Sequence, residues 1–373
     1  MAEKPEEKFV LSVAGDVSLP GTILFASGKI IASDEEKGKK VLDHVAPYFR
    51  ASQFNFFNLE SPISSKGQPA PIKPSCFRSY PSMLEVLKKS RIDFVGVANN
   101  HTLDYGWEAL EDTLELLRQN GIAYSGAGKN IAEARKPAIV RKDGMTVGFL
   151  SYTANVNTPL GFQASEARHG LAPMRISPFI VPDHCNKEDL EAMRNDVQKW
   201  KKEVDFLGVS FHWGISDGGT HTLTIHQEVM GRNAVEAGAD LVVGHHSHAL
   251  QAVEFYRGKP IVYGLGNFAL SFEEGFPRES MLLQCRISRH KVHELAFLPV
   301  YISDENRPEV VSPSSEDGQK VIAVMQKVCK PFGTEMVVTK GSEKVLLKGR
   351  APARKYKAGA VPKGKLAMKA KAR

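Results

Sequence analysis

The sequence lacks long apolar runs and closely paired cysteines. No stretch approaches the roughly 18 consecutive apolar residues that a membrane-spanning helix requires, and the charged start has no signal-peptide core. The cysteines, Cys76, Cys185, Cys285 and Cys329, are far apart and form no C-x-x-C pair. Reduced thiols are therefore favoured over a disulfide framework or a zinc knuckle, and we expect a cytoplasmic protein without a membrane span.

Acidic residues are missing from the carboxyl-terminal end. Residues 348–373 contain ten Lys or Arg and no Asp or Glu, so the net charge of +7 leaves −3 for the first 347 residues. This tail has too few apolar residues to fold alone. A solvated tail is favoured over a nucleic-acid-binding one, because Tyr356 is its only aromatic residue. We expect nucleic-acid binding, if any, only through this tail.

The remaining composition is that of a soluble globular protein. Hydrophobic residues make up 42% of the 373 residues and charged residues 24%. A chain of this length can bury a large core. The predicted organisation is a short amino-terminal tail over 1–8, an α/β domain over 9–305, a carboxyl-terminal extension over 306–347 and a disordered basic tail over 348–373.

Apolar runs of strand length alternate with amphipathic stretches of helix length. The predicted strands cover residues 9–15, 53–59, 93–98, 123–126, 204–211, 241–243, 281–287 and 295–302, with hairpins over 137–152 and 253–263. The predicted helices cover residues 39–50, 81–89, 104–119, 186–203 and 226–237. A proline-rich loop over 61–74 is a candidate wall of a site. Residues 153–182 show no clear period.

Three histidines follow one buried strand directly. Leu241 to Val243, bounded by Gly244, predicts a parallel strand covered on both faces. Ligand sites of open α/β sheets lie at the carboxyl ends of such strands. Residues two apart on an extended chain point to the same side, so we expect His246 and His248 to converge and His245 to point elsewhere. Imidazole is a common ligand of divalent metals.

Four further strand ends carry residues of the same kind. Each has an ordinary interpretation, such as a cap for Asp16, a solvated acid for Glu60 or a packed core histidine for His212. Their joint occurrence favours a metal site instead. Mixed oxygen and nitrogen donors suit Mn, Fe or Zn better than calcium, and six candidates fit two divalent ions. These candidates are Asp16, Glu60, Asn100, His212, His246 and His248.

The order of these motifs resembles that of the bacterial CapA family of poly-γ-glutamate capsule synthesis proteins. The resemblance spans about residues 9–302 and rests on Gly-Asp, Asn-Leu-Glu-Ser-Pro, Ala-Asn-Asn-His-Thr-Leu-Asp-Tyr-Gly, His-Trp-Gly, Gly-His-His-Ser-His and Leu-Gly-Asn-Phe. It implies the fold of calcineurin-like metallophosphoesterases, which is an α/β four-layer α-β-β-α sandwich with two sheets packed between helices.

The resemblance also implies a role for each site residue. Asp16 would bind the first metal, and Glu60 would bridge the two metals. Asn100 and His212 would hold the second metal. His246 and His248 would complete the coordination of the two ions. His101 would stay free as the catalytic histidine that protonates a leaving group. The usual Asp-x-His opening is Asp16-Val17-Ser18 here, so one metal lacks a nitrogen ligand and a single-metal site stays open.

Four other residues are candidates for contacts to the substrate or to the ligands. They are Arg78, Asp104, His245 and Asn267. Asp104 also fits a cap of the helix that follows it.

These features favour a metal-dependent hydrolase or transferase in which metal-activated water attacks a phosphoester or a γ-glutamyl amide, with His101 as the acid. The fold implied favours a phosphoester, whereas the family's association favours γ-glutamyl chemistry, and the residues do not choose between them. The expected partner is a small-molecule or polyglutamate-like substrate. The alternative is a non-catalytic accessory protein of poly-γ-glutamate (capsule) synthesis.

Overall fold

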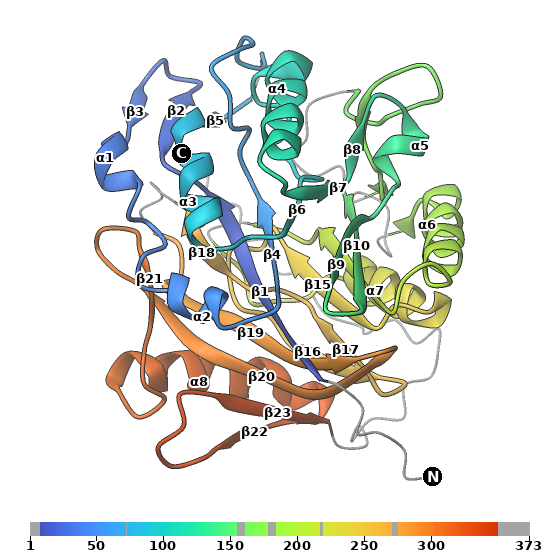
Figure 1. Ribbon diagram of the computed structural model, residues 1–373. Helices are drawn as coiled ribbons and strands as arrows, with labels where there is room; N and C mark the ends of the chain where they lie inside the picture. Colours follow the sequence, from blue (N-terminus) through green and yellow to red (C-terminus); the bar gives the residue numbers. More distant parts are fainter. Residues whose placement is uncertain are drawn as a thin grey trace, which may run out of the picture.

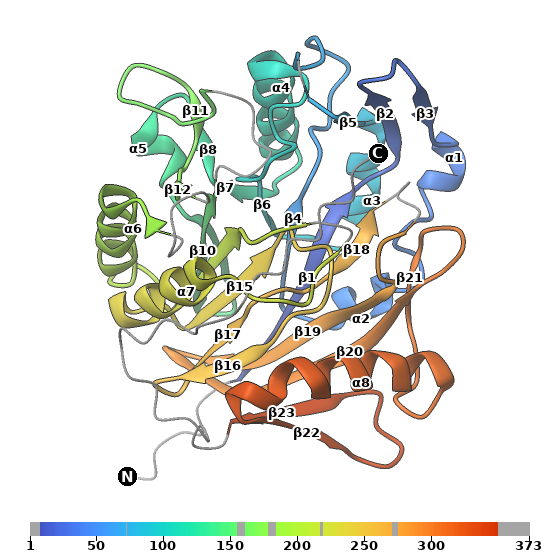
Figure 2. The ribbon, with the colours of Figure 1, turned by 180° about the vertical axis from the view of Figure 1, so that it is seen from behind.

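Two β-sheets pack face to face, and helices cover their outer faces (Figures 1 and 2). The computed structural model describes residues 8–71, 73–154, 161–177, 184–216, 219–270 and 275–349. The arrangement confirms the predicted α/β four-layer sandwich. Of the predicted tails, residues 1–7 and 350–373 lie outside the described residues, while Lys348 belongs to a strand.

The larger sheet is centred on the first strand of the chain. It contains β1 (Phe9–Ser18), β4 (Phe54–Leu59), β6 (Phe94–Gly96), β7 (Ala123–Ser125), β18 (Asn267–Leu270), β19 (Glu279–Ser288), β20 (Lys291–Ile302), β21 (Pro308–Val310), β22 (Thr334–Val338) and β23 (Val345–Gly349). The order is β22-β23-β20-β19-β1-β4-β6-β7, with β18 against β1 and β21 against β20. Strands β4 and β18 run parallel to β1, and β19 runs antiparallel to it.

The smaller sheet carries the histidine-rich strand ends. It contains β9 (Ala138–Lys142), β10 (Met145–Thr153), β14 (Phe206–His212), β15 (Leu241–His245), β16 (Val253–Tyr256) and β17 (Lys259–Val262), in the order β16-β17-β15-β14-β10-β9. Its four central strands are parallel, and the two edge strands are antiparallel. Both predicted hairpins are confirmed.

Aromatic and aliphatic side chains fill the space between the two sheets. Phe56 of β4 stacks on Phe149 of β10, with ring centroids 4.2 Å apart and an interplanar angle of 13°. Both rings are fully buried, as are Val13 of β1 and Val243 of β15 in the same cluster. Strands buried on both faces explain why these segments read as continuous apolar runs.

Helices cover the outer face of each sheet through one apolar side. The larger sheet is covered by α2 (Ala46–Arg50), α3 (Leu84–Lys89) and α4 (Gly106–Gln119), and the smaller sheet by α6 (Lys187–Trp200) and α7 (Ile225–Ala237). On α4, Leu110, Leu114 and Leu117 are buried, as their spacing predicted. The helix α8 (Glu316–Cys329) packs against β19, β20 and β22.

The helix predicted over 39–50 is wrong. The chain forms α1 (Glu35–Gly38), a series of turns and then α2, which has Pro47 in its first turn. Proline has no N–H and fits only the start of a helix, so the helical segment begins at Ala46 rather than before it.

Several short elements were not predicted. They are α5 (Ile131–Ala134), η2 (Lys330–Phe332), a sheet of β2 (Gly21–Phe25), β3 (Ile30–Ala32) and β5 (Ser75–Ser79), and the pairs β8 (Ala127–Gly128) with β11 (Gly170–Leu171) and β12 (Ile176–Ser177) with β13 (His184–Cys185). The helix predicted over 81–89 begins with the 3-10 turn η1 (Pro81–Met83) and continues as α3. In the part of the chain that the structure describes, no helix is both long and apolar enough to cross a membrane.

Replacing Phe56 by alanine tests the packing between the sheets. Phe56→Ala leaves a cavity against Phe149, so we expect the free energy of unfolding to fall by about 3–5 kcal/mol. Ile30→Ala is the control, because Ile30 is 64% exposed, and should change stability by less than about 0.5 kcal/mol. Urea unfolding followed by circular dichroism measures both, and equal small effects would contradict the inter-sheet core.

Candidate metal centre

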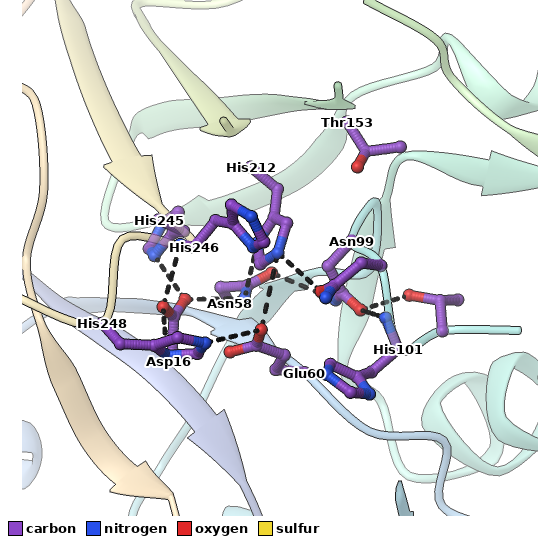
Figure 3. A network of polar contacts seen from close by, with 12 residues as sticks. Asp16, Asn58, Glu60, Asn99, His101, Thr153, His212, His245, His246 and His248 are labelled. Carbon is purple, nitrogen blue, oxygen red and sulfur yellow. Dashed lines mark hydrogen bonds and ion pairs between the residues drawn. The ribbon is translucent and has the colours of Figure 1, made fainter. Parts of the chain in front are cut away.

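The carboxyl ends of strands from both sheets meet at one place (Figure 3). Asp16 lies near the end of β1, Glu60 follows β4, His212 ends β14 and His245 ends β15. All four side chains are buried, with at most 3% of their surface exposed. The two sheets therefore deliver polar side chains into a space closed from water.

Asp16 is held as a carboxylate from several sides. Asn58 Nδ2 donates to its Oδ1 over 2.8 Å, the backbone N–H of His246 donates to Oδ2 over 3.0 Å, and His245 Nδ1 lies 3.1 Å from Oδ1. Burial opposes ionisation, but the contact with His245, the imidazoles nearby and the His246 N–H together lower the pKa of Asp16 below its ordinary value. Asp16 is thus an ionised carboxylate in a buried setting.

The approach of β1 to the loop before β18 requires Gly15. A Cβ atom at this position would lie 2.0 Å from the carbonyl oxygen of Gly266. The backbone N–H of Asp16 donates to that same oxygen over 3.1 Å. Glycine therefore lets the loop anchor the backbone of a site residue.

Glu60, His246 and His248 form a group that can hold a cation. One ligand atom from each lies within 4.8 Å of the others, and all three residues are buried. Among the residues that the structure describes, neither ring nitrogen of His246 has a hydrogen-bond partner. Desolvation and the neighbouring His248 lower the pKa of His246 to about 3, so its ring is neutral near pH 7. A buried neutral imidazole without a partner fits a metal ligand.

His212 and Asn100 complete the ring of donors. His212 Nε2 lies 2.8 Å from Asn100 Oδ1 and 3.4 Å from Glu60 Oε1. His248 Nε2 lies 4.0 Å from the same Glu60 oxygen. Burial and the surrounding imidazoles keep the pKa of His212 well below its ordinary value. Glu60 therefore stands between two imidazoles, His212 and His248, where one carboxylate oxygen faces both rings.

His246 and His248 converge, but not because the chain is extended. Strand β15 ends at His245, and the backbone φ angles of His246 and His248 are +84° and +53°. These left-handed conformations turn the two rings to one side, with centroids 6.0 Å apart. The expectation that His245 points elsewhere is wrong, since its Nδ1 contacts Asp16.

His101 lies in a separate setting beside this ring. Its Nδ1 is 2.6 Å from Asp104 Oδ2, and the Phe77 ring stacks on it at 3.9 Å with an angle of 11°. Because a carboxylate only accepts, Nδ1 carries the proton in this contact. Burial lowers the pKa of His101 to about 4. His101 is therefore a neutral imidazole whose Nε2 carries the lone pair.

Asp104 orients His101 rather than capping the next helix. The N-cap of α4 is Tyr105. Asp104 is fully buried, and its Oδ2 also accepts from the Phe77 backbone N–H over 2.6 Å. The capping interpretation is wrong, because this carboxylate is occupied by partners from β5 and from the turn after β6.

The other two residues expected to contact substrate or ligands differ from each other. Asn267 Oδ1 lies 2.7 Å from His248 Nδ1 and so fixes that ring. The guanidinium of Arg78 lies 4.1 Å from the centre of the Tyr105 ring, and its known contacts in the described chain include none of the six candidate ligands. Asn267 thus belongs to the centre, and Arg78 lies beside it.

Asn58, Asn99 and Lys73 were missed by the sequence analysis. Asn58 bridges Asp16 and His212, and Asn99 Nδ2 donates to Asn58 Oδ1 over 3.2 Å. Lys73 from the proline-rich loop donates to the Asn100 carbonyl over 2.6 Å and pairs with Asp104. The proline density predicted a wall of the site but could not single out this lysine.

The neutral imidazoles predict how the metal-free protein responds to pH. With a pKa of about 3 in the folded state and 6.5 in the unfolded state, His246 takes its proton first on unfolding. Its contribution to stability is complete above about pH 6.5 and falls as the pH is lowered toward 3, by on the order of 2 kcal/mol between pH 7 and pH 5. Urea titrations of chelator-treated protein at pH 7 and pH 5 measure this change. In His246→Gln the free energy of unfolding should fall less between the two pH values, and an equal fall in both proteins would contradict a neutral buried ring.

Comparisons with known proteins match these observations to one family. A family model described as bacterial capsule synthesis protein PGA_cap matches residues 10–271. The PGA biosynthesis protein CapA of Bacillus subtilis is 26% identical over 334 residues, covering 88% of this chain and 81% of that protein. A probable polyglutamine synthesis accessory protein of Mycobacterium tuberculosis is 28% identical over 298 residues, covering 77% and 75%. Among solved structures, NAD nucleotidase of Haemophilus influenzae is 13% identical, with a TM-score of 0.42 over 87% of this chain and 56% of that one.

Proposed function

The chain belongs to the PGA_cap family of bacterial capsule synthesis proteins, and on that premise we propose that it is a metal-dependent hydrolase or transferase acting in poly-γ-glutamate metabolism. The observation that carries the proposal is the group of Glu60, His246 and His248, in which a buried neutral imidazole has no hydrogen-bond partner. Protein interiors rarely leave such groups unsatisfied without a ligand.

Six residues would hold one or two divalent ions. They are Asp16, Glu60, Asn100, His212, His246 and His248, a mixture of oxygen and neutral nitrogen donors that suits Mn, Fe or Zn. A bound ion would lower the pKa of water toward neutrality and polarise the electrophilic group of the substrate. Asn58 and Asn267 would keep the ligands oriented, since they already bond Asp16 and His248.

His101 would move the proton of the reaction. Asp104 fixes its Nδ1–H, so Nε2 is the atom that exchanges a proton with the substrate. Because His101 is neutral near pH 7, it would first accept a proton from the attacking water and then return that proton to the leaving group. The stacked Phe77 ring holds the imidazole plane during this exchange. His101 thus acts first as a base and only then as an acid.

The names of the relatives support one substrate class over the other. The B. subtilis relative is described as a PGA biosynthesis protein, which favours a γ-glutamyl amide over a phosphoester for this chain. The second candidate function is a non-catalytic accessory role, because the M. tuberculosis relative is described as an accessory protein. Metal content and activity separate the two candidates.

Removal of one imidazole tests the ligand assignment. We expect elemental mass spectrometry of protein purified without a metal-affinity tag to find one or two equivalents of Mn, Fe or Zn. His246→Ala removes a donor with no other partner, so metal content should fall to half or less. His290→Ala is the control, because His290 is an exposed residue in the turn between β19 and β20. Wild-type protein without metal after reconstitution would contradict the proposal.

Replacement of His101 separates proton transfer from metal binding. His101→Gln should keep the metal and lower turnover of a γ-linked glutamate oligomer by about 10²–10⁴-fold, since a positioned acid–base group contributes that much. The substrate class is identified by two assays measured side by side: release of amino groups from the glutamate oligomer and release of phosphate from a panel of phosphoesters. Loss of metal in His101→Gln would make His101 a ligand, and unchanged turnover would remove it from the reaction.

A further inference from the structure

A cavity of about 440 Å³ opens between α5, α6 and the segment around residues 163–175. Figure 2 shows α5, β11 and α6 on the same flank of the molecule, beside the smaller sheet. Arg135, Arg168 and Arg175 line this cavity, and none of the six candidate metal ligands does. The cavity is therefore a second concave feature, separate from the metal centre.

Arg175 builds the wall of the cavity. Its Nε and one terminal nitrogen donate to the two oxygens of Asp189 over 2.8 Å each, and Asp189 is buried. Glu188 is exposed and lies 4.0 Å from Arg175. This bidentate pair neutralises Arg175 and fixes the start of α6 against the 163–175 segment.

Arg135 has a donor that nothing in the described chain accepts. Its Nε is buried and has no hydrogen-bond partner. Asp196 Oδ2 lies 3.8 Å away, too far for a hydrogen bond, and already accepts from the Tyr152 hydroxyl over 2.9 Å. Leaving a guanidinium N–H without an acceptor is costly, so Arg135, which lines the cavity, favours an acceptor bound beside it.

Arg168 supplies a second available guanidinium. Its side chain is exposed, and one terminal nitrogen donates to the Gln163 carbonyl over 2.9 Å. Among the ion pairs of the described residues, Arg168 has no carboxylate partner. Two guanidinium groups with open donors on one cavity suit carboxylates, because the planar fork matches the two carboxylate oxygens.

The cavity wall is joined to the metal centre by hydrogen bonds. Thr153 at the end of β10 donates to Ala172 over 3.1 Å and accepts from Met174 over 2.9 Å, on either side of the lining residue Pro173. The next residue, Ala154, donates to the carbonyl of His212 over 2.9 Å. Figure 3 shows Thr153 on the same side of the centre as His212 and Asn99.

A second contact ties the Arg168 segment to the region of His101. His169 stacks on Trp107 with ring centroids 4.0 Å apart and an angle of 13°. Trp107 lies in the first turn of α4, directly after the turn that carries His101 and Asp104. The loop that carries Arg168 is thus held against the start of α4.

We propose that this cavity is a subsite for the carboxylates of an oligoglutamate chain whose reacting unit lies at the metal centre. The inference rests on the proposed function, because it names the part of the substrate that lies away from the reacting bond. A γ-linked glutamate polymer carries one free carboxylate per unit, so units beyond the reacting bond can place carboxylates at a site away from the metal centre. Binding energy gained away from the reacting bond helps position that bond.

Binding to metal-free protein tests the subsite apart from catalysis. Isothermal titration calorimetry with a γ-linked glutamate pentamer should show binding that weakens about fivefold or more in Arg168→Gln and about tenfold in Arg135→Gln. Arg257→Gln, an exposed arginine in the turn between β16 and β17 at the opposite edge of the sheet, should bind like wild type. The melting temperature of Arg135→Gln shows whether that variant folds. If it does not fold, Arg135→Lys replaces it in the titration, because lysine keeps the positive charge beside Asp196.

The ligand chemistry is tested with two further probes. The same γ-linked pentamer with its carboxylates converted to carboxamides should not bind, and inorganic phosphate should not compete at concentrations that leave the protein folded. Binding of the carboxamide pentamer, competition by phosphate, or equal affinity in wild type and Arg168→Gln would each overturn the subsite. The titrations use metal-free protein, and the metal content of the same preparation before chelation is measured beside them, so failure of the metal proposal is seen separately.

Discussion

The structure depends on keeping carboxylates and imidazoles dry at the junction of two sheets. Asp16 and Glu60 are buried among His212, His246 and His248, and charge in such a place is stable only when it is paired or bound. Asp16 meets this condition through the hydrogen bonds from Asn58 and from the His246 backbone, and burial lowers the pKa values of His212 and His246 so that these two rings stay neutral. The parallel strands of both sheets must therefore end at the same edge, because only that arrangement brings all these groups together.

Much of the fold could be predicted because its strands are buried on both faces. Segments such as 241–243 and 204–211 are continuous apolar runs, and this pattern depends on local sequence alone. The sheet of β2, β3 and β5 could not be predicted in the same way. Its pairing joins Ile23 to Phe77 across more than fifty residues, and these strands show partial burial instead of a clear pattern. The late start of the helix predicted over 39–50 is marked by Pro47, which fits the first turn of a helix.

The candidate site was predicted by residue type better than by geometry. Histidines and carboxylates at strand ends are visible in the sequence, whereas the left-handed φ angles of His246 and His248 depend on the loop that follows β15. Lys73 shows the limit most clearly. It reaches Asn100 and Asp104 from a proline-rich loop about thirty residues away, and no local pattern distinguishes it from an exposed lysine. Contacts of this kind follow from tertiary packing, which fixes loops only after the sheets are in place.

Metal binding and catalysis are separate questions for this centre. A scaffold that only held an ion would explain the ligands around Glu60, and the ion would satisfy the buried nitrogens of His246. It would not explain His101. In the described chain its ring contacts Asp104, Phe77 and Lys73, and its backbone N–H donates to the Asn99 side chain, rather than to the candidate ligands. Desolvating this imidazole and fixing its tautomer costs stability that holding a metal does not return. A proton-transfer role accounts for that cost, because it requires Nε2 to stay unprotonated and correctly oriented beside the ligands.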